Sequence, residues 1–268
     1  MHPPLTAPAR VTERTLKTSA APVAVFDSGI GGIGVLRELQ RALPHENFLY
    51  FGDTAMAPYG ERPHDEIQAL VLRHATRLLS RAKALVLACN TATAVAAEAL
   101  RATYQNVPII GMEPAIRPAL FVRSHPTVLI LATPATLREQ KLTCLLHTYA
   151  ERADFIKCAA PSLVRLAEEG HFDDAATARE LNALLAPITA ARSPDAVVLG
   201  CTHFPFLSPA ISRYFGDTVP LFDGAAGTAR ETARRLTAAG LCNTQKKHGV
   251  TVLTASNAAS LNAMRRLL

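Results

Sequence analysis

The chain has 268 residues, of which 49% are apolar, and a formal net charge of +6. This apolar content is enough for a packed core, so it excludes a disordered protein. No apolar run is long enough to span a membrane, and residues 1–21 lack the hydrophobic segment of a secretory signal. Five cysteines, an odd number in a chain of this length, predict reduced thiols and a cytoplasmic location rather than a disulfide framework.

The positive charge is concentrated near the two ends of the sequence. Residues 1–21 carry a net charge of +2 and residues 227–268 a net charge of +6, which leaves −2 for the 205 residues between them. The body of the protein is therefore not basic, and this argues against nucleic acid as a partner. We also expect no membrane partner.

Short apolar runs alternate with helical patterns after residues 1–21, which are rich in Pro, Thr and Ala and predict a flexible extension. The predicted strands are 23–26, 48–51, 84–88, 108–111, 128–132, 154–158, 196–199, 220–222 and 250–253. The predicted helices are 33–43, 65–81, 91–104, 133–149, 163–169, 175–186 and 228–239. Uninterrupted apolar strands that alternate with amphipathic helices indicate an α/β fold with mainly parallel sheets flanked by helices.

The second half of the sequence repeats the pattern of the first. Leu85–Thr91 parallels Val197–His203, and Phe26–Ser28 parallels Leu131–Thr133. We therefore expect two similar α/β lobes, related by a pseudo-twofold duplication, with the active site between them. The predicted lobes are residues 22–113 with 230–268, and residues 114–229.

Two cysteines stand where predicted strands end. In open α/β sheets, ligands bind beyond the carboxyl ends of the strands, and this is where Cys89 and Cys201 lie. Each is followed by residues suited to begin a helix, whose positive N-terminus favours a thiolate. We therefore predict both as catalytic thiols. Cys144, Cys158 and Cys242 lack this context, and we expect them to serve packing.

Two opposed thiols suit a racemase, which takes a proton from one face of a carbon and returns one to the other face. Asp27, which closes the first strand, and His203, two residues after Cys201, are candidate partners for the thiols; each is equally suited to a capping or packing role. A hydrolase nucleophile acting with His203 is an alternative, although it leaves one thiol idle. We expect no metal, because no Cys-x-x-Cys pair exists and Cys201-x-His203 is not a standard zinc spacing.

A Gly-rich turn, Ser28–Gly32, leads into the first predicted helix. It matches neither the dinucleotide fingerprint nor the Walker motif, so it gives little support to a nucleotide site. Small hydroxyl or amide side chains near other strand ends suit a small ligand that bears carboxylates. These residues are Asn90, Thr91, Thr133, Thr136 and Thr202.

These segments together resemble the glutamate racemase family. The matching blocks, in family order, are Phe26–Gly32, Tyr50–Thr54 with Pro58–Gly60, Ala88–Thr93, Gly111–Ala115 and Gly200–Pro205. The resemblance runs from about residue 22 to about residue 227. It implies a cofactor-independent enzyme that converts L-glutamate to D-glutamate for peptidoglycan synthesis.

The resemblance also implies roles for individual residues. Cys89 and Cys201 would be the acid/base thiols, assisted by Asp27 and His203 respectively. The carboxylate of the second lobe matches Glu168, with the adjacent Glu169 as the alternative. The substrate would be lined by Asp27, Ser28, Pro58, Tyr59, Gly60, Asn90, Thr91, Thr133, Thr136, Thr202 and His203.

Other hypotheses remain open at this point. Ala132 and Arg165 depart from what is usual in the family, which puts the substrate contacts in question. A racemase of a related acid such as aspartate is one alternative. Another is a binding or regulatory protein that uses the same cleft without turnover. Such a protein could instead act on a nucleic-acid enzyme through its basic C-terminal helix. A homodimer is compatible with the sequence.

Overall fold

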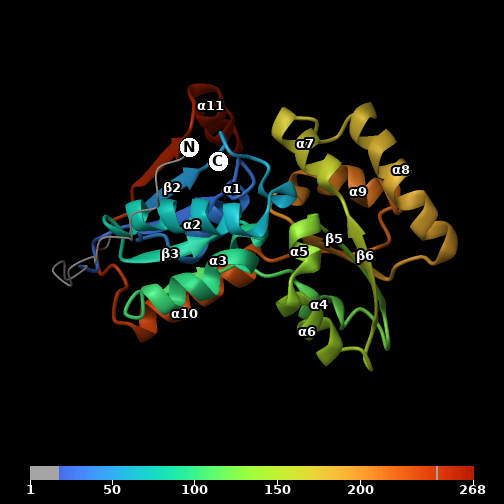
Figure 1. Cartoon of the computed structure of the whole chain (residues 1–268), viewed down its shortest axis with the longest axis horizontal. Coiled ribbons are helices and arrows are strands. Elements are labelled where there is room, and N and C mark those ends of the chain that lie inside the picture. Colours follow the sequence, from blue (N-terminus) through green and yellow to red (C-terminus); the bar gives the residue numbers. More distant parts are fainter. Residues whose placement is uncertain (1–17, 246) are drawn as a thin grey trace.

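The computed structural model describes residues 18–245 and 247–268, so most of the predicted extension at residues 1–21 lies outside the described residues. The chain forms two lobes that lie side by side, each built around one sheet (Figure 1). The strands of the first sheet are, in spatial order, β4 (Ile109–Gly111), β3 (Ala84–Leu87), β1 (Val23–Asp27), β2 (Phe48–Gly52) and β9 (Thr251–Ala255). Those of the second are β6 (Asp154–Ala159), β5 (Thr127–Ala132), β7 (Ala196–Gly200) and β8 (Leu221–Asp223).

Helices flank both sheets. The first sheet is flanked by α1 (Ile33–Ala42), α2 (His64–Leu79), α3 (Asn90–Thr103), α10 (Ala225–Ala238) and α11 (Ala258–Leu267). The second lobe contains α4 (Ile116–Ala119), α5 (Pro134–Arg138), α6 (Gln140–Thr148), α7 (Pro161–Glu169), α8 (Ala175–Ala191) and α9 (Ser208–Tyr214). Two short 3₁₀ turns are η1 (Tyr59–Glu61) and η2 (Phe204–Leu207). All strand pairs among the described residues are parallel, which confirms the predicted α/β fold.

The two sheets share one strand order. Without β9, the order β4-β3-β1-β2 in the first sheet is repeated as β8-β7-β5-β6 in the second. The registers also correspond, because Phe26 of β1 pairs with Leu87, and Leu131 of β5 pairs with Leu199. Cys89 and Cys201 therefore each follow their paired strand residue by two positions, at the same edge of their respective sheets.

The end of the chain packs against the first lobe. α10 lies beside α1, and Ala229 and Leu236 join the hydrophobic core on that side of the first sheet. β9 then pairs with β2, and Met264 of α11 is fully buried in the same core. The residue limits of the two lobes remain a prediction.

The chain crosses between the lobes twice, after β4 and after β8. At Gly224 a Cβ atom would lie 2.5 Å from the carbonyl oxygen of Glu113. The two crossing segments therefore touch at a point where only glycine fits without displacing backbone. Glu113 also forms an ion pair with Lys141 of the second lobe.

The helices differ from the sequence prediction in a few places. α4, α9 and α11 were not predicted; α4 is only four residues long, and α11 begins at an Asn257 cap whose side chain accepts from the Ser260 amide. α8 continues beyond residue 186, through Pro187, because Ile188 still packs against the core of the second lobe. None of the helices in the described ranges has the length and apolar character needed to cross a membrane.

Candidate active site

The two strand-end thiols are both buried, with 5% of Cys89 and 7% of Cys201 exposed. Cys89 is the N-cap residue of α3, and its Sγ accepts a hydrogen bond from the Ala92 amide at 3.4 Å. The other three thiols lie elsewhere. Cys158 is buried, but Cys144 is exposed, so the prediction that Cys144 serves packing is wrong; α6 presents it to solvent.

Cys89 lies in surroundings that favour its protonated form. Burial raises the pKa of Cys89 to about 12, and the nearby charges of Asp27 and Cys201 act in the same direction. The Ser28 hydroxyl lies 3.3 Å from Sγ and acts in the opposite sense, as does the Ala92 amide. At neutral pH this group is a thiol and can donate a proton.

Cys201 is the first member of a thiol–imidazole–carboxylate chain. Its Sγ lies 3.6 Å from Nδ1 of His203, and Nε2 of His203 lies 2.5 Å from Oε1 of Glu168. Burial favours the neutral imidazole, but the contacts with Cys201 and Glu168 prevail and raise the pKa of His203 well above its usual value. A protonated His203 stabilises negative charge on Cys201.

The carboxylate in this chain is that of Glu168. Its Oε1 also accepts the Ile30 amide of the first lobe at 3.1 Å, whereas Glu169 is exposed. Burial alone would raise the pKa of Glu168, but the contacts with His203 and with the Ile30 amide lower it. Glu168 is therefore an anion that joins the two lobes at the site.

Asp27 is fully buried at the end of β1. Its Oδ1 accepts from the Gly29 amide at 2.8 Å, and its Oδ2 accepts from the Thr202 hydroxyl of the second lobe at 3.1 Å. Burial raises the pKa of Asp27, and the His203 charge opposes this rise. Among the described residues Asp27 affects Cys89 through its charge, while Ser28 is the side chain within hydrogen-bond distance of that thiol.

Threonines from both lobes meet beside Cys89. The Thr91 hydroxyl lies 2.9 Å from that of Thr133 and 3.3 Å from that of Thr136. Asn90 is 3% exposed, and none of the described residues hydrogen-bonds to either polar atom of its side chain. Because buried amides are normally paired, Asn90 is available to a polar ligand.

The turn at residues 58–60 completes this group of residues. Tyr59 is buried and donates to Oδ2 of Asp53 at 2.7 Å. A Cβ atom on Gly60 would lie 2.5 Å from Cβ of Thr133, so this turn of the first lobe packs closely on the second. The structure thus gathers the predicted residues at the boundary between the lobes. Asp53 was not predicted as a site residue, although its place directly after β2, at the same sheet edge, was a usable signal.

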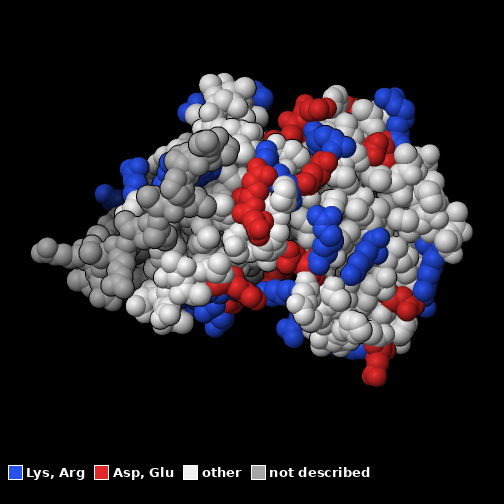
Figure 2. All heavy atoms as spheres, viewed as in Figure 1, with Lys and Arg blue, Asp and Glu red and all other residues white. Residues whose placement is uncertain are grey.

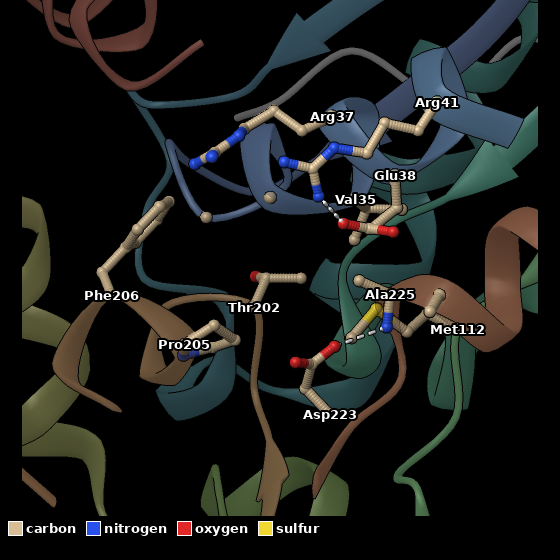
Figure 3. Close-up of a pocket in the computed structure, with 13 residues that line it drawn as sticks. Val35, Arg37, Glu38, Arg41, Met112, Thr202, Pro205, Phe206, Asp223 and Ala225 are labelled. Carbon is tan, nitrogen blue, oxygen red and sulfur yellow. Dashed lines mark hydrogen bonds and ion pairs between the residues drawn. The ribbon is translucent and has the colours of Figure 1, made fainter. Parts of the chain in front are cut away.

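A pocket of about 320 Å³ opens beside this group (Figure 3). Side chains of α1, among them Arg37 and Arg41, lie on one side of it, and Asp223 and Ala225 lie on the other. Thr202 projects between these two sides, but neither thiol lines the pocket. The described residues contain no group of three or more His, Cys, Asp or Glu side chains arranged to hold a metal ion.

Comparison with known proteins agrees with the fold. A family model described as Asp/Glu/Hydantoin racemase matches residues 33–232. The chain belongs to this family and is therefore of the isomerase class.

Its relatives carry a more specific name. The chain is 43% identical over 250 residues to a glutamate racemase of Deinococcus radiodurans, covering 92% of this chain and 86% of that protein. Escherichia coli glutamate racemase, solved with L-glutamate and the activator UDP-MurNAc-ala, is 30% identical with a TM-score of 0.80, covering 92% of this chain and 95% of that one. The Francisella tularensis enzyme, solved with D-glutamate, is 26% identical with a TM-score of 0.80, covering 92% and 94%.

Proposed function

We propose that this protein is a glutamate racemase that uses Cys89 and Cys201 as its two acid/base groups, without a cofactor. The observation that carries the proposal is the pair of buried thiols at equivalent strand ends, each with a different proton partner. The relatives named above support glutamate as the substrate. Structures of two of them contain L-glutamate and D-glutamate respectively.

The two thiols divide the reaction between them. The Cys201 thiolate removes the α-proton from one enantiomer, and the electron pair of the broken C–H bond remains on the substrate as a carbanion. The Cys89 thiol then donates its proton to the opposite face of that carbon, which gives the other enantiomer and leaves a thiolate on Cys89. The reverse reaction exchanges the two roles. His203 and Glu168 hold positive and negative charge beside Cys201 while its proton moves.

Substrate entry requires the lobes to separate, because both thiols are buried. The contacts that must open include Ile30 with Glu168, Asp27 with Thr202, and the group around Thr91. Asn90 lies at this boundary with its amide unpaired by the described residues, and we assign it to the substrate carboxylates. Closing the lobes around the substrate also excludes water from the carbanion.

A thiol–imidazole–carboxylate chain also suits a cysteine nucleophile. Hydrolysis, however, would leave Cys89 without a role, and the family supports racemisation. The product, D-glutamate, would supply peptidoglycan synthesis in the cytoplasm.

The test is racemisation of L-glutamate and of D-glutamate by the purified protein, without added cofactor, in deuterated water. We expect inversion in both directions with incorporation of deuterium at the α-carbon. Aspartate is the comparison substrate, and faster turnover of aspartate would reassign the specificity. Binding of glutamate without inversion or exchange would reject the enzyme function and favour a binding protein.

A further inference from the structure

A buried carboxylate lies behind the candidate active site. Asp53 is 3% exposed, and its Oδ2 accepts from the Tyr59 hydroxyl at 2.7 Å. Nε2 of His74 lies 3.1 Å from the same oxygen, and the Ser256 hydroxyl lies 3.4 Å from Oδ1. The backbone amide of Asp53 also donates to the carbonyl of Asp27 at 3.0 Å. Asp53 therefore connects four other segments of the first lobe.

His74 is the side chain of α2 that faces this carboxylate. It lies on α2 beside two aromatic rings, with ring centroids 5.8 Å from Phe26 and 4.8 Å from Phe51. Its contact with Asp53 is at ion-pair distance, although the two groups are not aligned as a hydrogen bond. Burial favours a protonated Asp53, but the contacts with His74 and Tyr59 prevail and lower the pKa of the carboxyl. A buried charge of this kind is tolerated only when it is paired.

Tyr59 connects Asp53 to the boundary between the lobes. Its ring is 1% exposed and lies 6.3 Å from the ring of Phe26, so the side chain is held by packing and by the bond to Asp53. The next residue, Gly60, packs directly on Thr133, whose hydroxyl contacts Thr91. The position of the Tyr59 ring thus sets how the turn at residues 58–60 meets the second lobe.

We propose that His74 is a positioning residue that, through Asp53 and Tyr59, fixes the turn at residues 58–60 against Thr133. The proposal rests on the proposed function and on the expectation from the sequence that this turn lines the substrate. His74 does not touch the substrate. It holds the carboxylate of Asp53 in place, so that Tyr59 is anchored before substrate arrives.

The kinetic test compares three variants on the α2 helix. His74→Leu removes the partner of Asp53. We expect KM for glutamate to rise by about tenfold, which corresponds to about 1.4 kcal/mol. The value of kcat should change by less than about threefold. His74→Gln keeps a polar N–H donor and should restore KM to within about threefold of wild type. Leu70→Ala, the matched control, weakens the packing of the same helix without touching Asp53 and should leave KM unchanged.

Two results would overturn the positioning role. One is an unchanged KM in His74→Leu, and the other is an equal rise of KM in Leu70→Ala, which would mean that any loosening of α2 has the same effect. A defect in His74→Gln as large as that in His74→Leu would also count against it.

A second measurement does not depend on turnover. In urea unfolding, Tyr59→Phe should destabilise the wild-type protein more than it destabilises His74→Leu, because Tyr59 and His74 act on one oxygen of Asp53. Additive effects would reject the coupling. An inactive wild-type protein with coupled unfolding would instead reject the proposed function and leave the support at Asp53 intact.

Discussion

Cys89 and Cys201 occupy the same place in two sheets of the same strand order, yet their surroundings differ. Cys89 has a hydroxyl and a backbone amide as partners and a buried carboxylate nearby. Cys201 has an imidazole backed by a second carboxylate. The duplicated fold fixes where the thiols lie, while the residues next to them give each thiol different hydrogen-bond partners.

This asymmetry bears on the proposed two-base mechanism. Cys89 is protonated, because burial and the nearby charges raise its pKa to about 12. Cys201 faces His203, whose pKa is raised by its contacts with Cys201 and Glu168. The proposed two-base mechanism needs two proton-transfer groups, and this difference between the lobes gives each thiol its own proton partners.

The largest effect should come from removing either thiol. Cys89→Ala and Cys201→Ala should each lower racemisation by about 10³-fold or more, because each deletes one proton-transfer group. The measurement is optical rotation of L-glutamate and D-glutamate solutions, with α-deuterium exchange followed by NMR. In each variant, residual exchange of the α-hydrogen should be confined to one enantiomer of glutamate. The enantiomer that exchanges in Cys89→Ala should be the opposite of the one that exchanges in Cys201→Ala.

The matched control for the thiols is Cys158→Ala. Cys158 is also buried, and burial also raises its pKa, but it lies in β6 among the apolar side chains of the second-lobe core. The Cys158→Ala variant should retain wild-type activity. Full activity in either Cys89→Ala or Cys201→Ala would contradict the two-base mechanism.

The next largest effect should come from the partners of Cys201. His203→Asn should lower kcat by about 100-fold, and Glu168→Gln by about tenfold, since a charged hydrogen bond contributes ~1.5–3 kcal/mol. Glu169→Gln is the control for Glu168, because Glu169 is exposed on the same helix. Steady-state assays suffice, and a larger loss in Glu169→Gln than in Glu168→Gln would reverse the assignment of the carboxylate.

The same pair should make stability depend on pH. His203 has a raised pKa in the folded protein, so its contribution is complete below its usual value of 6.5 and declines as pH rises through the folded-state pKa. Glu168 has a lowered pKa, so its contribution is complete above 4.5 and is lost as pH falls. The free energy of unfolding of the wild-type protein should therefore exceed that of the His203→Asn variant, and the difference should be largest between pH 4.5 and 6.5.

Urea unfolding followed by circular dichroism measures this difference. We expect the gap between wild type and His203→Asn to shrink as pH rises above 6.5. A gap that widens with pH over this range would show that His203 is neutral in the folded protein.

The smallest effect should come from the rim of the site. Arg165 of α7 pairs with Glu61 of η1 at 2.6 Å, and both side chains are about half exposed. Figure 2 shows acidic and basic side chains next to one another along this boundary. Exposed ion pairs contribute ~0.2–1 kcal/mol, so Arg165→Gln should change kcat/KM by less than about fivefold and reduce its dependence on salt.

The control for the rim is Arg213→Gln. Arg213 pairs with Asp173 inside the second lobe, at 2.7 Å and with similar exposure. Loss of this ion pair should leave the salt dependence of kcat/KM unchanged. An equal change in both variants would mean that the contact between the lobes has no special role in opening.

The sequence predicted the parts of the site that follow from a single lobe. Cys89, Cys201 and Asp27 were located because buried apolar strands are easily read and the residues after them share one sheet edge. Contacts across the lobes, such as Ile30 with Glu168 or Thr202 with Asp27, were not predicted. They depend on how two sheets are oriented to each other, and no local pattern encodes that. The contact between Asp53 and His74 was missed for a different reason, since the two residues lie in one lobe but meet only through packing of α2 on the first sheet.

The pairing of β9 with β2 has a consequence for how the protein is made. Residues 251–255 complete the first sheet, although they follow the whole second lobe in the sequence. During translation, the edge of β2 stays uncovered while the whole second lobe emerges, and unpaired edges of this kind recruit other strands. A nascent chain halted before residue 251 would carry an intact pair of thiols on a sheet still open to aggregation.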